Sequence, residues 1–386
     1  MSKSFIKKNL TKKSLIKKIS TVVILFLSIA QTGCSVPQNM PVSMEGFYFD
    51  TICSVTVYDL ELKDSGLPAG LSLKHQKTAG KEERARELIQ GAFELCGRYE
   101  DILSKTRENS DIYRINNSHG SFVVCDPETV AVIKKGIYYG ELSGGRFDIT
   151  VGGLSELWDF HTDDPELPEK EDIEEALKHV GYKNIETDGN RVRLTDSQAK
   201  LDIGGLAKGY IADRVSQYLK KEGVKSAVIS LGGDVVCIGE KKINGESTKF
   251  KVGIETPYSD MSRISRTIEL SDGTAVTSGV YERFFEKDGK KYHHILDPKT
   301  GYPVQTDMLS ATVISDEGAS CDCDALATIC IMLGYEEAER FMQGQKGFSK
   351  VFIPASNEPS HALRVFGECR EGQISRGSAA GYLTLP

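Results

Sequence analysis

The sequence predicts an α+β fold: a single large domain with a mixed, largely antiparallel sheet and packed helices. Three observations lead to this prediction. Helical and extended segments are mixed without the regular strand–helix alternation of a doubly wound sheet, and several neighbouring strands are close enough to be joined by hairpins. The chain of 386 residues shows no internal repeat and no convincing internal linker, so 46–386 is expected to be one domain.

Helices are predicted from apolar residues that recur every three or four positions and from capping residues at the ends. The second begins at Pro127 behind a capping Asp126, because proline has no N–H to leave unbonded at a helix start. Glycine follows several others and marks their ends. In chain order the predicted helices cover 82–104, 127–142, 172–180, 206–222, 322–333 and 336–343.

Strands are predicted where Val, Ile, Thr and Tyr gather in short runs bounded by glycine or polar turns. Residues 191–195 and 200–203 are close enough to form a hairpin, whereas 60–81 are polar and aperiodic and predict a loop. In chain order the predicted strands cover 47–59, 191–195, 200–203, 226–231, 235–238, 249–255, 263–270 and 309–315, with two more near Lys350 and Ala362.

The N-terminus is typical of an export signal. A lysine-rich head precedes an apolar run over 19–30, too short for a comfortable membrane span, and Gln31-Thr32-Gly33-Cys34 follows. The Gly-Cys junction resembles a bacterial lipobox, so 1–33 are expected to be a lipoprotein signal peptide and Cys34 the lipidated first residue, with 34–45 as a tether. An uncleaved signal anchor is the alternative. Both place the body at the extracytoplasmic face of the cell membrane.

Composition narrows the classes of partner. The net charge of -7 argues against a nucleic-acid-binding surface, although a small anionic ligand needs only a local positive site. Besides Cys34 the cysteines are scattered, and only Cys321 and Cys323 lie close together. That spacing matches neither a zinc site nor a thioredoxin-like pair, and most cysteines occupy apolar positions, so buried free thiols are expected.

The segment 292–303 leads from a strand-like stretch into a tight turn. Asp297-Pro298-Lys299-Thr300 has the composition of a type I turn, and Gly301 lets the chain leave it. His293 and His294 are neighbours on the extended stretch, so their side chains point to opposite faces and only one can face a given site. A histidine fixed beside a rigid turn suits proton transfer near neutral pH, although an isolated pair is also compatible with packing.

Two further patterns concern metal and anion binding. Asp324 and Thr328 lie four apart on one face of a helix start, and their oxygens suit Mg²⁺; a helix-start acid and a back-bonded threonine would give the same spacing. The segment 202–209 joins a strand to a helix through Gly204-Gly205, which lets the backbone approach an anion at a helix N-terminus. It is neither a Walker A loop nor a G-x-G-x-x-G fingerprint, and a plain tight turn is the alternative.

Two more glycine turns complete the set. The segment 144–148 would present backbone amides, an aromatic face and a carboxylate to a ring system, and 231–234 follows a buried strand. Each of them alone is compatible with a structural turn.

Together these segments resemble the ApbE family of flavin transferases, the FAD:protein FMN transferases. The matching strings occur in the family's order over about 47–352 and several are long and ungapped, so the resemblance is specific. They are 145–152, 202–209, 232–234, 277–283, the histidine turn and 324–328. The resemblance implies an ApbE-like fold, related to the tunnelling fold.

The resemblance also implies an activity. Family members cut the pyrophosphate of FAD with Mg²⁺ and pass FMN to a threonine or serine hydroxyl of a partner flavoprotein bearing a Ser/Thr-Gly-Ala-Ser/Thr motif, releasing AMP. His294 would be the general base. Asp324, Thr328 and the carbonyl of Gly205 would hold Mg²⁺. The residues expected to contact the substrate FAD are Phe49, Thr106, Arg146, Phe147, Asp148, Asp202, Lys208 and Ile295.

One departure from the family pattern is Thr106, where many relatives carry a Tyr or Trp that stacks on the flavin. Because such stacking contributes about 1 kcal/mol, its loss predicts weaker FAD retention, with Phe49 compensating in part. Two alternatives therefore stay open. In one, water replaces the acceptor hydroxyl and the protein hydrolyses FAD to FMN and AMP. In the other, the protein is a lipid-anchored flavin-binding or solute-binding module without catalysis and without a Mg²⁺ requirement.

Overall fold

The computed structural model describes residues 41–62, 73–162, 164–243, 245–255, 264–355, 365–366 and 374–376. The predicted signal peptide and Cys34 lie outside the described residues, as does most of the predicted tether. None of the helices in these ranges is both long and apolar enough to span a bilayer. The predicted tether boundary at residue 45 is wrong, because the first strand begins at Val42 and 42–45 pair with the second strand.

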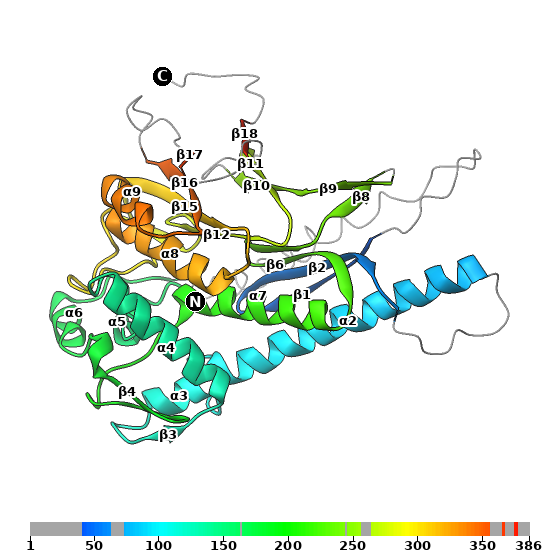
Figure 1. Cartoon of the computed structure of the whole chain (residues 1–386). Helices are drawn as coiled ribbons and strands as arrows, with labels where there is room; N and C mark the ends of the chain where they lie inside the picture. Colours follow the sequence, from blue (N-terminus) through cyan, green and yellow to red (C-terminus); the bar gives the residue numbers. More distant parts are fainter. Residues whose placement is uncertain are drawn as a thin grey trace, which may run out of the picture. The chain divides into compact units, whose positions relative to one another are not determined.

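An eight-stranded antiparallel sheet is the centre of the fold and confirms the α+β prediction (Figure 1). Its strand order is β1-β2-β6-β7-β12-β15-β16-β17, so sequence neighbours are often hairpin partners. The strands are β1 Val42–Tyr48, β2 Thr51–Leu60, β6 Val224–Leu231, β7 Asp234–Ile238, β12 Thr274–Gly279, β15 Met308–Ser315, β16 Ser349–Pro354 and β17 Val365–Phe366.

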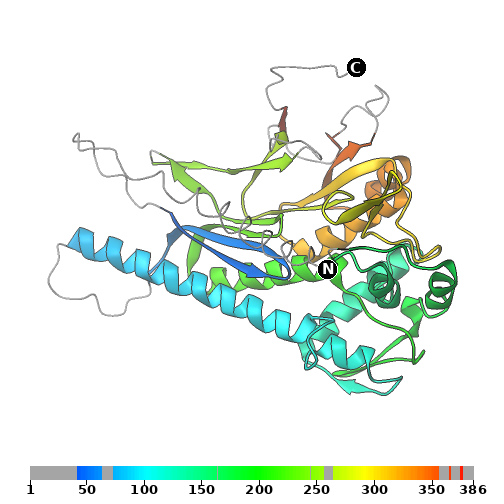
Figure 2. The same cartoon turned by 180° about the vertical axis from the view of Figure 1, so that it is seen from behind.

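Helices cover one face of this sheet and a smaller sheet covers the other (Figures 1 and 2). The alternation along β6 explains the two layers: Ala227 and Ile229 join the core under the helices, whereas Val228 packs with Phe250 on the opposite side. The helices are α2 Leu73–Leu103, α7 Gly204–Lys221, α8 Ser320–Leu333 and α9 Tyr335–Gln343. The smaller sheet contains β10 Phe250–Glu255, β11 Ile264–Leu270 and β18 Ile374–Arg376.

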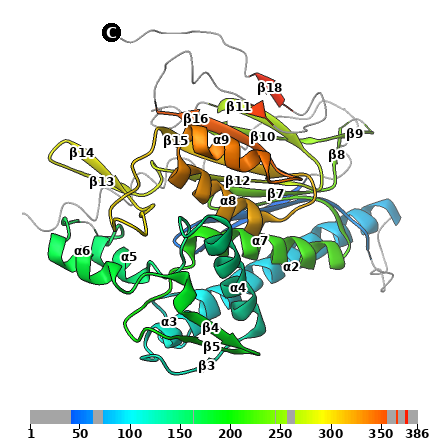
Figure 3. The same ribbon diagram turned by 60° about the vertical axis from the view of Figure 1, so that its left-hand side comes forward.

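Most of the remaining elements surround one end of the helical layer, whereas β8 and β9 lie next to β10 of the smaller sheet (Figures 1 and 3). A short hairpin, β13–β14, stands apart from the large sheet and lies beside α5 and α6 (Figure 3). These elements are α3 Asp111–Asn116, β3 Val123–Val124, α4 Pro127–Leu142, α5 Gly152–Trp158, α6 Lys170–Leu177, the 3₁₀ turn Tyr182–Asn184, β4 Ile185–Asp188, β5 Arg191–Leu194, β8 Lys241–Ile243, β9 Glu246–Thr248, β13 Phe284–Lys287 and β14 Lys290–His293.

The predicted helices are all present, and the cysteines behave as expected. Seven cysteines of the described residues are buried free thiols, while Cys369 lies outside these residues. Helix α2 begins at Leu73 rather than at residue 82, so the predicted loop over 60–81 is wrong at its end. Residues 73–81 lack an apolar stripe, but most of them are good helix formers, and that preference carries no periodic signal.

Two strand predictions are wrong in an informative way. The predicted strand 47–59 is divided between β1 and β2, joined by Phe49 and Asp50, which both have positive φ (55° and 57°). Such a turn normally shows Asn-Gly, so the sequence gives no signal for it. Residues 200–203 do not pair with β5; the side chain of Asn116 bonds both backbone groups of Leu201 (2.7 and 3.0 Å) and replaces a strand partner.

Candidate active site

Lys208 stands at the centre of a charged cluster beneath the large sheet. It projects from α7 to the carboxylate of Asp234, with 3.3 Å between Nζ and each oxygen, and Asp234 is fully buried behind the glycine turn after β6. Burial and the nearby Asp324 raise the pKa of Asp234 despite the adjacent ammonium group. Burial opposes the charge of Lys208, yet Asp234 and Asp324 raise its pKa, so it stays protonated.

Asp324 reaches this cluster because α7 and α8 approach closely. A Cβ at Gly209 would lie 2.2 Å from the carbonyl oxygen of Ser320, so only glycine permits this approach. The carboxylate of Asp213 on α7 accepts hydrogen bonds from the first amides of α8, those of Ser320 and Cys321 (2.8 and 3.0 Å). Two contacts between the same helices therefore fix the side chain of Asp324 against α7.

The carboxylate of Asp324 is buried but only partly bonded. Its Oδ2 accepts a hydrogen bond from the amide of Gly209 (3.0 Å), and within the described part of the chain its Oδ1 accepts none. Burial raises the pKa of Asp324, although the charge of Lys208 and the amide of Gly209 oppose the rise. A bound cation would oppose the rise further.

Thr328 and Gly205 supply further oxygen atoms beside Asp324. Thr328 lies one helical turn further along α8, and its hydroxyl is 3.1 Å from that of Ser278 on β12. A Cβ at Gly205 would lie 3.7 Å from the Thr328 hydroxyl and 3.0 Å from the ring of Phe147, so the three predicted site residues meet here. A carboxylate, a hydroxyl and a carbonyl are hard oxygen donors and fit Mg²⁺. No cluster of three or more His, Cys, Asp or Glu ligands occurs among the described residues.

The two histidines have different hydrogen-bond partners. His293 is buried, and its Nδ1 accepts from the amide of Ile295 (3.3 Å), so its Nε2 carries the proton and donates to the carbonyl of Val304 (3.1 Å). Both of its ring nitrogens are therefore used to hold the two arms of the turn. His293 is a structural residue.

In His294 the two ring nitrogens have the reverse roles, which leaves one of them available as a base. Its Nδ1 lies 3.2 Å from the carbonyl oxygen of Arg283, which only accepts, so Nδ1 carries the proton and Nε2 keeps a lone pair. In the described ranges no residue is bonded to Nε2. Burial lowers the pKa of His294 to about 4, and the charges of Arg283 and Lys208 contribute. The imidazole is thus neutral at neutral pH.

The histidine and the metal-ligand candidates share one electrostatic environment. The charge of Lys208 lowers the pKa of both Asp324 and His294. Glu282, in the segment between β12 and β13, also senses this cluster: burial raises its pKa, Lys208 opposes the rise and Asp324 adds to it. Lys208 therefore interacts electrostatically with the carboxylates of this cluster and with the imidazole of His294.

An aromatic cluster holds the histidine turn in place. The buried indole of Trp158 donates to the carbonyl of Gly301 (2.8 Å), and its ring lies 5.5 Å from that of Tyr292 and 6.3 Å from that of Phe285. The predicted turn is confirmed: the amides of Thr300 and Gly301 donate to the carbonyl of Asp297 (3.2 and 2.8 Å). Helix α5 thus anchors the turn that follows His294.

Not every predicted FAD-contacting residue lies in this cluster. Arg146 bonds the C-terminal turn of α8 and Glu337 of α9. Asp148 accepts from the amide of Thr150 in its own loop and from the amide of Tyr182 in the 3₁₀ turn. Burial raises the pKa of Asp148. Their contact with FAD stays a prediction.

Three other predicted FAD-contacting residues lie beside residues of this site. Phe49 forms the β1–β2 turn, whose neighbour Ile52 accepts from the amide of Gly232 (3.2 Å) next to Asp234. Ile295 is buried beside His294, and Thr106 is exposed next to Lys105, which bonds Asp202 (2.7 Å).

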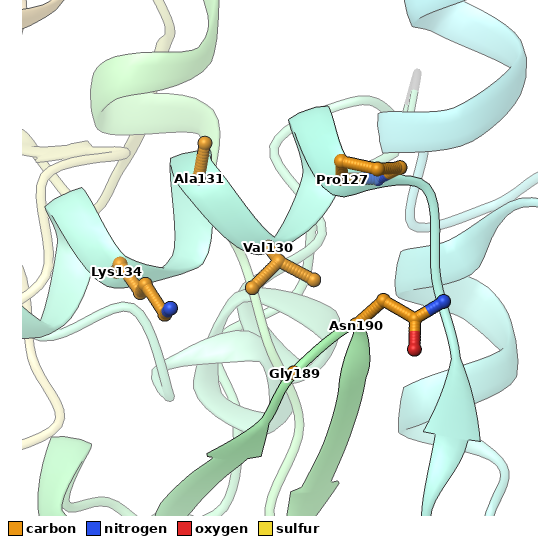
Figure 4. A pocket seen from close by; sticks show the side chains of 6 residues that line it. All are labelled: Pro127, Val130, Ala131, Lys134, Gly189 and Asn190. Carbon is orange, nitrogen blue, oxygen red and sulfur yellow. The ribbon is translucent and has the colours of Figure 1, made fainter.

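The structure adds residues to which the sequence assigned no role. Asp234, Ser278 and Glu282 lie in the strings 232–234 and 277–283 that match the family, whereas Lys105 and Ser155 have polar side chains with no distinctive spacing. A separate pocket between α4 and the β4–β5 turn contains no predicted site residue (Figure 4). It is lined by Pro127, Val130, Ala131, Lys134, Gly189 and Asn190.

The fold and this cluster of residues define a class: an α+β protein whose site contains a helix N-terminus, hard oxygen donors, a lysine and a neutral imidazole, the components of phosphoryl-group transfer. The ApbE family model matches residues 49–352, and the chain belongs to the ApbE family.

Relatives of known name and structure agree with this assignment. The FAD:protein FMN transferase of Treponema pallidum is 32% identical over 278 residues, covering 69% of this chain and 76% of that protein. That of Klebsiella pneumoniae is 32% identical over 274 residues, covering 70% and 83%. The crystal structure of the ApbE protein from Thermotoga maritima has a TM-score of 0.69 at 30% identity and covers 88% of this chain and 97% of that one.

Proposed function

We propose that this protein is an FAD:protein FMN transferase that requires Mg²⁺, attaches FMN through a phosphoester to a serine or threonine hydroxyl of an acceptor protein, and releases AMP. The names of its relatives support the substrate and the transferred group. The observation that carries the chemistry is the tautomer of His294, because a bonded Nδ1 leaves the basic Nε2 available to a hydroxyl.

In this proposal the acceptor hydroxyl gives its proton to Nε2 of His294 while its oxygen attacks the phosphorus on the flavin side of the pyrophosphate. The bond between that phosphorus and the bridging oxygen breaks, and AMP leaves with the oxygen. Lys208 faces the negative charge of the diphosphate, and the N-terminus of α7 favours an anion nearby.

The charges in the cleft explain why a divalent cation is proposed. Lys208 already faces Asp234 and Asp324, and Lys105 is paired with Asp202, so the two lysines are largely neutralised before an anionic substrate enters. Asp324, Thr328 and the carbonyl of Gly205 would hold Mg²⁺. When bound, Mg²⁺ supplies charge neutralisation on the pyrophosphate.

We also propose the place and partners of the activity. Lipidation of Cys34 would hold the protein at the extracytoplasmic face of the membrane, within reach of flavoproteins bearing a Ser/Thr-Gly-Ala-Ser/Thr segment. The basic head and the short apolar run of the N-terminus support this location.

One incubation separates this function from its alternatives. The purified protein is mixed with FAD, Mg²⁺ and an acceptor carrying a Ser/Thr-Gly-Ala-Ser/Thr segment, and the products are separated under denaturing conditions. A fluorescent acceptor together with AMP supports the transferase. Free FMN and AMP with an unlabelled acceptor would identify an FAD pyrophosphatase, and unchanged FAD would identify a binding protein.

The lowered pKa of His294 predicts the pH dependence of transfer. Because the ordinary histidine value of 6.5 falls to about 4, Nε2 remains unprotonated and basic from pH 8 down to about 5. We expect kcat/KM for FAD to show no loss centred near pH 6.5 on the acid side. A pH–rate profile with saturating acceptor and Mg²⁺ checks this, and an acid limb near 6.5 that follows one proton would contradict it.

A further inference from the structure

Three segments that are distant in sequence meet at Lys105. This residue lies in the loop between α2 and α3, and its Nζ is 2.7 Å from Oδ2 of Asp202 and 3.0 Å from the hydroxyl of Ser155 on α5. Ser155 also donates to Oδ2 of Asp202 (2.7 Å). Asp202 lies two residues before α7 begins at Gly204, so one ammonium group connects the start of this helix with two other parts of the site.

The hydrogen-bond count shows that Asp202 is held in a single orientation. Its Oδ1 accepts from the amide of Gly204 (2.9 Å), and its Oδ2 accepts from both Lys105 and Ser155. Three of about four acceptor positions of the carboxylate are thus filled from inside the protein. Lys105 uses two of its three donors in the same cluster.

This ion pair differs from an ordinary surface pair. The side chains of Lys105 and Asp202 are 29% and 22% exposed, which leaves less water to screen them than at a fully exposed pair. Burial alone would raise the pKa of Asp202, but Lys105 and the other donors lower it to about 2. Among the described residues, Lys105 is the only ion-pair partner of Asp202, so without the ammonium group this carboxylate would have no direct charge partner there.

The ion pair between Lys105 and Asp202 matters because of the glycine backbone that follows Asp202. Gly204-Gly205 follows Asp202, and Gly205 lies against Phe147 and Thr328, where the metal and the pyrophosphate are proposed to bind. A helix start that loses its anchor at Asp202 would present this glycine backbone less uniformly to a ligand. We therefore expect loss of this ion pair to weaken nucleotide binding.

We propose that Lys105 is a positioning residue for the nucleotide: it orients Asp202 and thereby fixes the glycine-containing first turn of α7 that receives FAD. This inference rests on the proposed function for the identity of the nucleotide. Lys105 has no role in proton transfer in this proposal.

The test compares two substitutions at Lys105 with a matched control. Lys105→Met removes the ammonium group, Lys105→Arg keeps the charge, and Lys81→Met removes a similar ion pair elsewhere on the protein, where Nζ of Lys81 lies 2.8 Å from Asp59 with side chains 32% and 37% exposed. FAD binding is measured by flavin fluorescence with Mg²⁺ and without acceptor. Transfer is then measured at saturating FAD, and the thermal midpoint of each variant is recorded.

We expect Lys105→Met to weaken FAD binding about tenfold to a hundredfold, the effect of a lost hydrogen bond to a charged group. The kcat at saturating FAD should stay within about twofold, Lys105→Arg should recover most of the affinity, and Lys81→Met should bind FAD like the wild type. A general loss of stability would not raise KM alone, and Lys105→Arg would not reverse it.

Two results would overturn the inference: Lys105→Met binding FAD with wild-type affinity, or Lys105→Met lowering kcat with unchanged KM. These outcomes are separate from a failure of the proposed function. If the wild type binds FAD but labels no acceptor, the transferase proposal fails, while weaker binding by Lys105→Met would still support the positioning role.

Discussion

Replacement of His294 by alanine should lower the rate of FMN transfer by about 10²–10⁴-fold and leave FAD binding close to that of the wild type. The reason is that His294 contributes a free Nε2 and no other bond in the cluster around Lys208, while its Nδ1 bond to Arg283 is at the edge of the turn. The measurement is single-turnover labelling of the acceptor at saturating FAD and Mg²⁺, with FAD affinity determined in parallel.

The control for this prediction is another histidine. His119 is exposed and has a φ of 48°, a conformation that asparagine adopts readily, so His119→Asn should transfer FMN at the wild-type rate. His293→Ala is expected to act differently from His294→Ala, because His293 holds both arms of the turn and its loss should lower thermal stability. Transfer by His294→Ala at close to the wild-type rate would remove this residue from the mechanism.

Replacement of Asp324 by asparagine should remove the Mg²⁺-dependent activity, with a loss of roughly 10²-fold or more, because a metal ion contributes several kcal/mol to such reactions. Asparagine keeps the shape of the side chain and the hydrogen bond partners but not the charge that the cation balances. Isothermal titration of Mg²⁺ into the protein with FAD present checks this directly. The variant should show little or no saturable binding.

Asp322 is the matched control on the same helix. It bonds Lys135 and the hydroxyl of Tyr139 (2.6 Å for the latter) on α4, away from Lys208. Asp322→Asn should therefore lose some stability and keep the wild-type affinity for Mg²⁺. Equal titration curves for Asp324→Asn and the wild type would show that the cation binds elsewhere.

Much of this fold is predictable because its signals are local. Asp126 and Pro127 mark the start of α4, and the residues 297–301 form the turn that their composition indicates. The β1–β2 turn was not predictable, since Phe49 and Asp50 adopt positive φ without glycine or asparagine. The pairing of 200–203 failed for another reason, because a side chain far away in the sequence, that of Asn116, bonds its backbone.

The candidate site was likewise predictable from the sequence only in part. Asp324, Thr328 and His294 are identifiable because each occupies a recognisable string. In the structure the charge of Lys208 acts on both Asp324 and His294, and the hydroxyl of Thr328 lies beside that of Ser278. The role of Lys105 depends on the meeting of three segments, and no spacing in the sequence encodes it. The close approach of α7 and α8 at Gly209 likewise becomes visible only when the carbonyl of Ser320 is in place.

In the proposed mechanism, a divalent cation and the imidazole of His294 lie close together and act on the same bound FAD. Mn²⁺ in place of Mg²⁺ tests it most directly, through the paramagnetic broadening of histidine ring signals in a sample with FAD bound and with the His294 signal assigned from His294→Ala. We predict strong broadening of the His294 ring signals that disappears in Asp324→Asn. A His294 signal that stays sharp while Mn²⁺ is bound would contradict the account.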